Sequence, residues 1–175
     1  PDPGKKYYLY FEAADYHTRV SINGQNIGEH EGGFTPFAFE ITNHFSESVQ
    51  NSITVAVDNT HTAQTVPEVA YDWWNYGGIT RPVWIVEVPE TFIHSYFFRL
   101  ADDGRKIAVD LHLDGSKATE TEVTVSIPEL ALVAKAKTGS DGKASMTLAA
   151  DDLELWSPSN PKLYRVVVTN HLDTV

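Results

Sequence analysis

Apolar and polar residues alternate along most of the chain with a period of two, whereas a helix would repeat every 3.6 residues. In the first half, the apolar positions that share one face are Leu9 and Phe11, Val20 and Ile22, and Ile53, Val55 and Val57. In the second half they are Ile107, Val109, Leu111 and Leu113, followed by Val123, Val125 and Ile127. This alternation predicts β-strands with one buried face, and no segment has the pattern of a long helix.

Turn-forming residue pairs separate these alternating segments. Asn23-Gly24 is a strong hairpin signal, and three Asp-Gly pairs follow at 103–104, 114–115 and 141–142. Strands about 8–12 residues apart with turns of this kind are typical of β-sandwiches. We therefore predict an all-β chain that forms two consecutive antiparallel β-sandwiches.

A domain boundary is expected near Pro89, which interrupts two strand-like segments. Residues 1–88 carry three of the four tryptophans and most of the glycine, whereas residues 89–175 resemble a plain seven-strand sandwich rich in Val, Thr and Ala. The first part has about five predicted strands, fewer than the seven or eight of a usual two-sheet sandwich. We expect that its first strands precede the sequence given.

The composition argues against several classes of partner. The 175 residues carry a net charge of −11, which repels nucleic-acid phosphates, and no basic run is present to hold an anionic membrane surface. No apolar run approaches the roughly 20 residues of a membrane helix. The start, PDPGKK, does not have the apolar core of a signal peptide. The sequence leaves the compartment open between the bacterial cytoplasm and export.

The chain offers little chemistry outside one segment. Without cysteine it has no thiolate nucleophile, disulfide or cysteine-ligated zinc. Glu29-His30-Glu31 could bind a metal, but the pattern also fits a solvated strand end, which we favour. Asp102-Asp103 and Asp151-Asp152 lie at turn positions, where aspartate caps backbone amides. We therefore expect no catalytic residue, metal site or cofactor in this chain.

Residues 60–80 form a long connection between two strands, and its end, DWWNYGGI, concentrates aromatic rings and polar groups. Loops of this length are commonly functional or disordered, and disorder disfavours aromatics. One interpretation is that the rings plug an end of the sandwich while Gly77-Gly78 permits the turn. The other is sugar recognition, in which rings pack on the C–H patches of a pyranose while a carboxylate and an amide bind its hydroxyls. The candidate substrate-binding residues are Asp72, Trp73, Trp74, Asn75 and Tyr76.

Four segments, in this order, resemble glycoside hydrolase family 2, which contains β-galactosidases, β-glucuronidases and β-mannosidases. They are YLYFEAADYHTRVSINGQNIGEHEGGFTPFAFEIT, NSITVAVDN, DWWNYGGITRPVWI and LELWSPSNPKLYRVVV. Together they extend over essentially the whole chain, so the resemblance is more specific than any single motif. It implies that residues 1–88 are part of a jelly-roll, galactose-binding-like sandwich and that residues 89–175 are an immunoglobulin-like sandwich.

The resemblance also implies that the catalytic residues lie elsewhere. Family members hydrolyse β-glycosides with retention, using two glutamates on a (β/α)₈ barrel of roughly 250 residues that follows these sandwiches. This chain is therefore expected to support the barrel without catalysing the reaction itself. The aspartate that corresponds to Asp72 reaches into the barrel's active site and holds a sugar hydroxyl. Arg81 is expected to anchor the loop by pairing with a carboxylate.

The resemblance leaves further partners open. A sodium or magnesium ion is implied for the complete enzymes, and self-association through the sandwiches would be consistent with the family. Two other interpretations are an independent carbohydrate-binding module with Trp73 and Trp74 as its platform, and an immunoglobulin-like interaction domain with no role in sugar binding.

Overall fold

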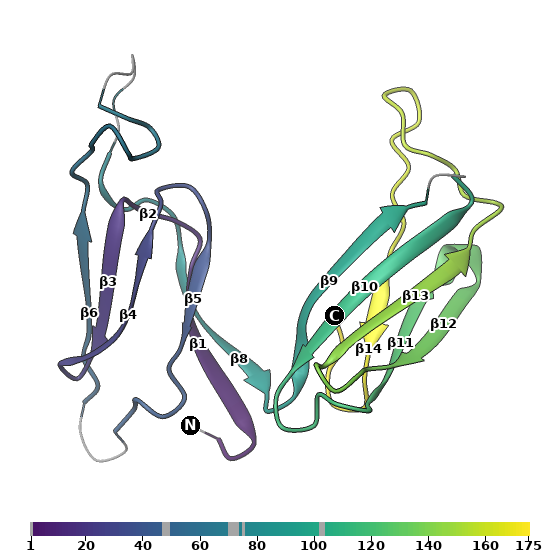
Figure 1. The fold of residues 1–175 in the computed structure, drawn as a ribbon, viewed down its shortest axis with the longest axis horizontal. Helices are drawn as coiled ribbons and strands as arrows, with labels where there is room; N and C mark the ends of the chain where they lie inside the picture. Colours follow the sequence, from purple (N-terminus) through teal and green to yellow (C-terminus); the bar gives the residue numbers. More distant parts are fainter. Residues whose placement is uncertain (1, 47–49, 70–73, 75, 102–103) are drawn as a thin grey trace. The chain divides into compact units, whose positions relative to one another are not determined.

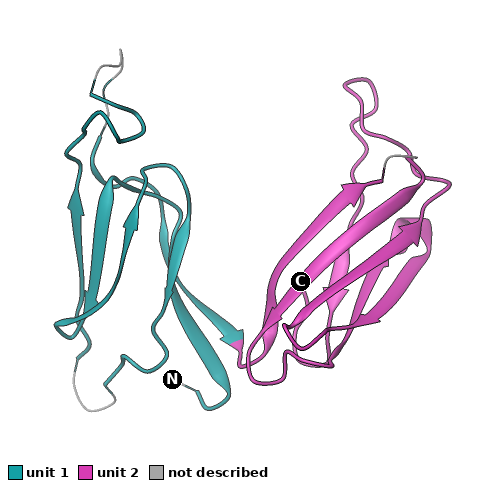
Figure 2. Ribbon diagram, in the orientation of Figure 1, with its two compact units in different colours: residues 1–88 teal, residues 89–175 magenta. Residues whose placement is uncertain are grey.

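The computed structural model describes residues 2–46, 50–69, 74, 76–101 and 104–175, and the chain divides into two compact units, residues 1–88 and 89–175 (Figures 1 and 2). In the first, unit 1, the strands are β1 (Lys5–Phe11), β2 (Ala14–Asp15), β3 (His17–Ile22), β4 (Gln25–Glu31), β5 (Phe37–Glu40), β6 (Ile53–Asp58), β7 (Gly78–Ile79) and β8 (Val83–Pro89). In unit 2 they are β9 (Phe92–Leu100), β10 (Lys106–Asp114), β11 (Glu122–Ile127), β12 (Leu132–Lys137), β13 (Lys143–Ala149) and β14 (Val167–Thr169), with one 3₁₀ turn, η1 (Pro128–Leu130). The predicted all-β fold is confirmed. The described residues contain no helix that is long and apolar enough to cross a membrane.

Unit 1 packs two three-stranded sheets, β5-β1-β8 and β4-β3-β6, against one another. Leu9 and Phe11 of β1 are buried in one cluster with Val20 and Ile22 of β3, together with Ile41. The cluster joins the two sheets because each strand sends alternate side chains toward the other sheet. Strands β2 and β7 form a separate short ladder.

The hairpin between β3 and β4 turns at Asn23-Gly24, where the sequence predicts it. Ile22 pairs with Gln25, so the connection has two residues, and both have positive φ: 52° at Asn23 and 81° at Gly24. Asparagine and glycine tolerate this left-handed conformation, and its twist matches that of the paired strands. Local chemistry therefore fixes the register of this pair.

Unit 2 packs sheet β13-β10-β9 against sheet β12-β11-β14. The predicted alternation is observed, since the buried core includes Ile107, Val109, Leu111, Leu113, Val123, Val125 and Ile127. The sequence predicts seven strands here, whereas the described residues of this unit contain six. Residues 153–166 form an isolated bridge between Ser157 and Asn160 in place of a strand, because Pro158 and Pro161 lack the backbone donors that a ladder needs.

Candidate functional site

The long connection 59–77 begins and ends beside the same short strand, β2. The Tyr16 amide, directly after β2, donates to the carbonyl oxygen of Asp58, the last residue of β6, at 3.2 Å. At the other end, Asp15 pairs with Gly78 in the β2–β7 ladder. Both ends of the connection are therefore fixed to two adjacent residues.

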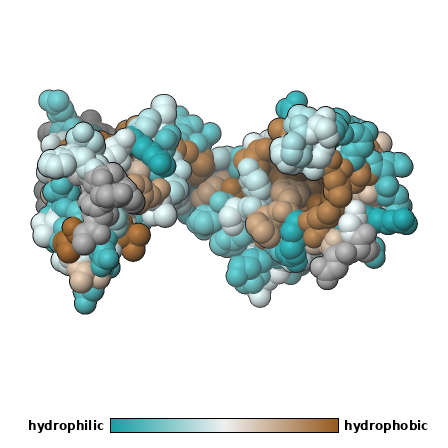
Figure 3. Space-filling model, turned by 90° about the horizontal axis from the view of Figure 1, so that it is seen from above, coloured by the Kyte–Doolittle hydropathy of each residue, from teal (hydrophilic) through white to brown (hydrophobic). Residues whose placement is uncertain are grey.

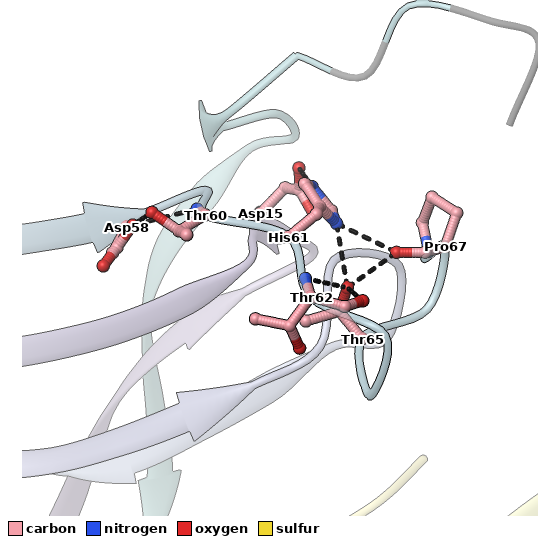
Figure 4. A network of polar contacts seen from close by, with 7 residues as sticks. All are labelled: Asp15, Asp58, Thr60, His61, Thr62, Thr65 and Pro67. Atoms are coloured by element: carbon pink, nitrogen blue, oxygen red, sulfur yellow. Dashed lines mark hydrogen bonds and ion pairs between the residues drawn. The ribbon is translucent and has the colours of Figure 1, made fainter. Parts of the chain in front are cut away.

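A polar network closes the first part of this connection into a turn (Figure 4). His61 Nδ1 lies 2.9 Å from the carbonyl oxygen of Pro67 and 3.2 Å from Thr65 Oγ1. Because a carbonyl oxygen can only accept, Nδ1 carries the proton of the contact with Pro67. The Thr65 hydroxyl oxygen accepts from the Thr62 amide at 3.1 Å. The segment 61–67 is therefore held in a turn by hydrogen bonds of its own side chains, in addition to the contacts that fix the two ends of the connection 59–77.

The opposite side of the His61 ring faces a buried carboxylate. Nε2 lies 3.6 Å from Oδ2 of Asp15, and the two side chains are 11% and 3% exposed, respectively. The Tyr16 ring tilts against His61 at 5.6 Å between centroids. This geometry is that of an ion pair whenever the imidazole is protonated, and a buried carboxylate requires polar partners of this kind. Asp15 therefore belongs both to the β2–β7 ladder and to the network of the connection.

Three glycines lie near this site, one required by its backbone conformation and two by close neighbouring side chains. Gly78 has φ of +92°, a conformation that side chains other than hydrogen rarely permit. Gly33 lies so close to Asp15 that a Cβ there would overlap the carboxylate oxygen Oδ1. Gly77 similarly leaves no room for a Cβ, because Asn59 packs against it. These glycines allow the chain to pass close to Asp15 and to the start of the connection.

A pocket of about 260 Å³ opens beside Asp15 in unit 1. Its lining residues are Asp15, Gly33, Phe34, Trp74, Tyr76, Thr80 and Arg81. Trp74 and Tyr76 are 81% and 73% exposed, respectively. Rings that plug the end of a sandwich would be buried, so this exposure favours a contact surface over a plug. The pocket combines aromatic walls with a hydroxyl, a carboxylate and a guanidinium.

The structure brings together three of the residues that the sequence singles out: Trp74, Tyr76 and Arg81 all line this pocket. Asp72, Trp73 and Asn75 lie outside the described residues. Within the described part of the chain, no carboxylate forms an ion pair with Arg81, which is exposed at the pocket. Its expected pairing with a carboxylate stays a prediction.

The Glu29-His30-Glu31 pattern does not gather its side chains. Glu29 accepts a hydrogen bond from Arg19 at 2.7 Å, and this contact lowers the pKa of the Glu29 carboxyl. The ring of His30 stacks on Phe37 at 4.0 Å between centroids, and burial lowers the pKa of His30. Among the residues that the structure describes, no group of three or more histidine and acidic side chains could hold a metal ion.

Sequence reasoning missed the Asp15–His61 contact. Neither residue belongs to the aromatic segment, and they lie far apart in the chain. One signal was His61 itself, because a histidine at the start of a long loop can be buried when its ring nitrogens find partners. Asp15 was another, because it directly follows two alanines in a strand-like segment, where a carboxylate is unusual.

A second hollow that the sequence did not reveal lies in unit 2. Figure 3 shows hydrophobic side chains gathered around a hollow on this unit. A cavity of about 240 Å³ is lined mainly by apolar and aromatic side chains, joined by Arg99, Glu154 and Lys162. The apolar and aromatic members are Phe98, Leu100, Ile107, Leu153, Leu155, Trp156 and Tyr164. Leu155 and Trp156 are each 58% exposed. Adjacent apolar rings at 96–98, which point to both faces of β9, could have indicated it.

Comparison with known proteins identifies the family. Residues 4–89 match the family model described as "Glycosyl hydrolases family 2, sugar binding domain", and residues 91–175 match the one described as "Glycosyl hydrolases family 2". The chain belongs to glycosyl hydrolase family 2. The resemblance of the four segments to this family is therefore confirmed over nearly the whole chain.

Similar members of family 2 are several times longer. The chain is 29% identical to a β-galactosidase of Thermoanaerobacter pseudethanolicus, over 94% of this chain and 24% of that protein. It is 30% identical to a β-glucuronidase of Canis lupus familiaris, over 90% of this chain and 27% of that protein. The structure of a Bifidobacterium dentium β-glucuronidase complexed with coumarin-3-O-glucuronide superposes with a TM-score of 0.83 at 25% identity, over 99% of this chain and 36% of that one. The chain thus spans about a quarter to a third of these relatives.

Proposed function

We propose that this chain is a non-catalytic region of a family 2 glycosidase, which supports a catalytic barrel and contributes the loop at residues 72–76 to substrate binding. The observation that carries the proposal is the pocket of unit 1, where Trp74, Tyr76 and Arg81 meet beside buried Asp15. The relatives named β-galactosidase and β-glucuronidase support a β-glycoside as the substrate class.

The chemistry of the pocket fits a sugar. The exposed faces of Trp74 and Tyr76 can pack on the C–H patches of a pyranose ring. The Arg81 guanidinium can donate to ring hydroxyls or to a carboxylate, and the Thr80 hydroxyl can donate or accept. A few such contacts give weak binding alone, since a millimolar complex requires about 4 kcal/mol. The pocket is therefore proposed as part of a site that the rest of the enzyme completes.

The division of labour follows from the reaction. Retaining glycosidases need an acid/base and a nucleophile about 5–5.5 Å apart, which the family provides with two glutamates on its barrel. We propose that Asp72 holds a sugar hydroxyl at that centre and that Trp73 and Asn75 flank it. A sodium or magnesium ion in the complete enzyme is part of this proposal. The residues of this chain would bind and orient the sugar without taking part in bond cleavage.

The supporting role is proposed for unit 2. Its hollow presents apolar side chains, including Trp156 and Leu155, that water solvates poorly. The relatives extend over three to four times the length of this chain, so the proposed occupant is the remainder of the same polypeptide, the barrel. Contact of that kind would bury the hollow in the complete enzyme.

The decisive experiment uses the complete protein that contains this chain. Asp72→Ala should lower kcat/KM by about 10–150-fold, because a hydrogen bond to a charged group contributes about 1.5–3 kcal/mol. Glu68→Ala is the matched control, since it removes an exposed carboxylate of the same connection that does not line the pocket. Equal turnover of the folded Asp72→Ala enzyme and the wild type would contradict the proposed contact.

The alternative of an independent carbohydrate-binding module makes a different prediction for the isolated chain. Titration of residues 1–175 with galactosides, glucuronides and mannosides should then quench tryptophan fluorescence, with Trp74→Ala as the variant that abolishes the change. The proposed function instead predicts a flat titration up to millimolar sugar, because one loop supplies too few contacts.

A further inference from the structure

We propose that Asp15 and His61 are positioning residues that clamp both ends of the connection 59–77 and so hold Trp74 and Tyr76 at the pocket. The effect on binding rests on the proposed function, whereas the clamp rests on contacts within unit 1 alone. Neither residue is part of the aromatic segment, and neither is proposed to touch the sugar's reacting atoms.

The clamp is a consequence of where Asp15 lies. Its backbone pairs with Gly78 at the exit of the connection, and its carboxylate faces His61 near the entry. Without such a link, a connection of this length is restrained at its ends alone, and its interior conformations cost little to exchange. One buried side chain therefore couples the entry of the loop to its exit.

His61 transmits this link into the loop. Its Nε2 faces the Asp15 carboxylate, while its Nδ1 donates to the carbonyl oxygen of Pro67, so the ring spans the distance between β2 and the turn 61–67 (Figure 4). The ring is confined further by Tyr16. Shifting either partner would break contacts at both sides of the imidazole.

Asp15 also shapes the pocket directly. Its carboxylate lies against Gly33, where no Cβ would fit, and it lines the cavity with Trp74 and Arg81. Displacement of the carboxylate would therefore change the pocket wall and release the turn 61–67 together. A pocket whose wall is held this way keeps its geometry when it is empty, which lowers the entropic cost of binding.

The test is amide hydrogen exchange on the chain 1–175, read by NMR at single residues. Asp15→Asn keeps the shape of the side chain and removes its charge. The amide of Thr62, which donates to Thr65 Oγ1, and that of Thr65, which donates to the Thr62 carbonyl, should exchange at least about tenfold faster in this variant. Amides of β3 and β10 serve as references for the two cores.

Asp58→Asn is the matched control. The Asp58 carboxylate is exposed and accepts from the amide of Thr60 at 2.9 Å, two residues away at the start of the same connection. Asparagine keeps an oxygen that accepts from Thr60 but removes the charge, so any change should stay near Thr60 and leave Thr62 and Thr65 at their wild-type rates. Unchanged rates at Thr62 and Thr65 in Asp15→Asn would overturn the clamp.

A second variant covers the case in which Asp15→Asn also loosens β3. His61→Phe keeps a ring beside Tyr16 but cannot bridge Asp15 to Pro67. It should accelerate the same two amides, and the double variant should add little, since both changes break one link. Fully additive effects of the two substitutions would show that they act separately and would contradict the pair.

The consequence for function is read in the complete enzyme as a KM-against-kcat split. Asp15→Asn should raise KM by about tenfold and leave kcat near its wild-type value, because the reacting groups are proposed to lie outside this chain. Loss of kcat alone would contradict a positioning role. If Asp72→Ala leaves kcat/KM unchanged while Asp15→Asn still accelerates exchange, the proposed function fails and the clamp stands.

Discussion

The two units build their cores differently. In unit 2, β10 and β11 bury every second side chain, and aliphatic residues dominate the core. Among the described residues the buried cluster of unit 1 is smaller, and aromatic rings complete it: Phe11 stacks on Phe37 at 4.7 Å between centroids. An aromatic ring buries more area than an aliphatic side chain, so a few rings stabilise a unit with fewer fully buried positions.

Strand β10 of unit 2 and strand β8 of unit 1 differ in how far their apolar side chains are buried. In β10, residues alternate between buried and partly exposed positions. In β8, four consecutive apolar residues, Val83, Trp84, Ile85 and Val86, are all exposed, although their sequence also suggests a strand with one buried face. Strand β8 lies at the edge of its sheet. The period of two therefore determines which face a side chain points to, whereas burial depends on a second layer over that face.

The buried polar groups differ as well. In unit 2 the Thr138 hydroxyl donates to the Ala118 carbonyl at 2.6 Å and accepts from the Thr121 amide, which satisfies the backbone of a turn. Unit 1 buries the carboxylate of Asp15 against an imidazole. A hydrogen-bonded neutral hydroxyl is cheap to bury, while an ionisable pair is costly to remove from water. In unit 1 the costly buried pair lies at the wall of the candidate pocket, because Asp15 belongs to both.

The largest expected effect separates the two cores. Phe11→Ala should lower the free energy of unfolding of unit 1 by about 3–5 kcal/mol, because it removes a fully buried ring and its stack on Phe37. Leu113→Ala should cost about 2–5 kcal/mol in unit 2. Urea unfolding followed by NMR signals of each unit measures both. Since each cluster contains residues of one unit, loss of both sets of signals at one midpoint would contradict separate cores.

The next largest effects compare the stability cost of replacing one glycine in each unit by alanine. Gly78→Ala should destabilise unit 1 by about 1–2 kcal/mol, because φ is +92° but open space surrounds the new methyl group. Gly115→Ala should destabilise unit 2 more, since φ is +118° and the Cβ would meet the backbone of Glu90 and Thr91. Thermal unfolding of each unit gives the ranking. An equal cost at both positions would show that the backbone near Gly115 gives way easily.

The hollow of unit 2 predicts a smaller effect on binding of an apolar probe. Anilinonaphthalene sulfonate should bind the isolated chain, and Trp156→Ser should weaken that binding by about tenfold, because an exposed ring contributes on the order of 1–2 kcal/mol of contact. Trp74→Ser in unit 1 is the control, since its pocket is more polar. Equal loss with both variants would mean that the probe does not distinguish the two hollows.

Much of this fold could be predicted from the sequence, because strands and tight turns depend on residues that are neighbours in the chain. The strands of β3, β10 and β11 follow from alternation, and the turn at Asn23-Gly24 follows from the conformations that these residues tolerate. The aromatic segment was selected by composition, and two of its members line the pocket. The contact of Asp15 with His61 could not be predicted in this way, since it depends on β2 lying beside the end of β6, far away in the chain. For the apolar lining of unit 2, the adjacent rings at 96–98 indicate only one side, since the lining forms where β9 meets residues 153–164.

The smallest expected effect is a dependence of the stability of unit 1 on pH, which arises from His30. Burial against Phe37 lowers the pKa of His30 below its ordinary value of 6.5, and a contact with the Gly32 backbone partly opposes this shift. The unfolded chain therefore takes up the proton more readily than folded unit 1. Stability that depends on neutral His30 is complete above pH 6.5 and is lost as the pH falls through the folded pKa.

Unit 1 should accordingly lose stability as the pH falls below 6.5, and His30→Phe should flatten this dependence because phenylalanine keeps the stack on Phe37 without titrating. Urea midpoints of the two units across this range provide the measurement, with unit 2 as the internal reference. His112→Phe in unit 2 should leave the pH dependence of unit 1 as it is. A His30→Phe chain that loses stability as steeply as the wild type would assign the dependence to other groups and remove His30 from the difference between the units.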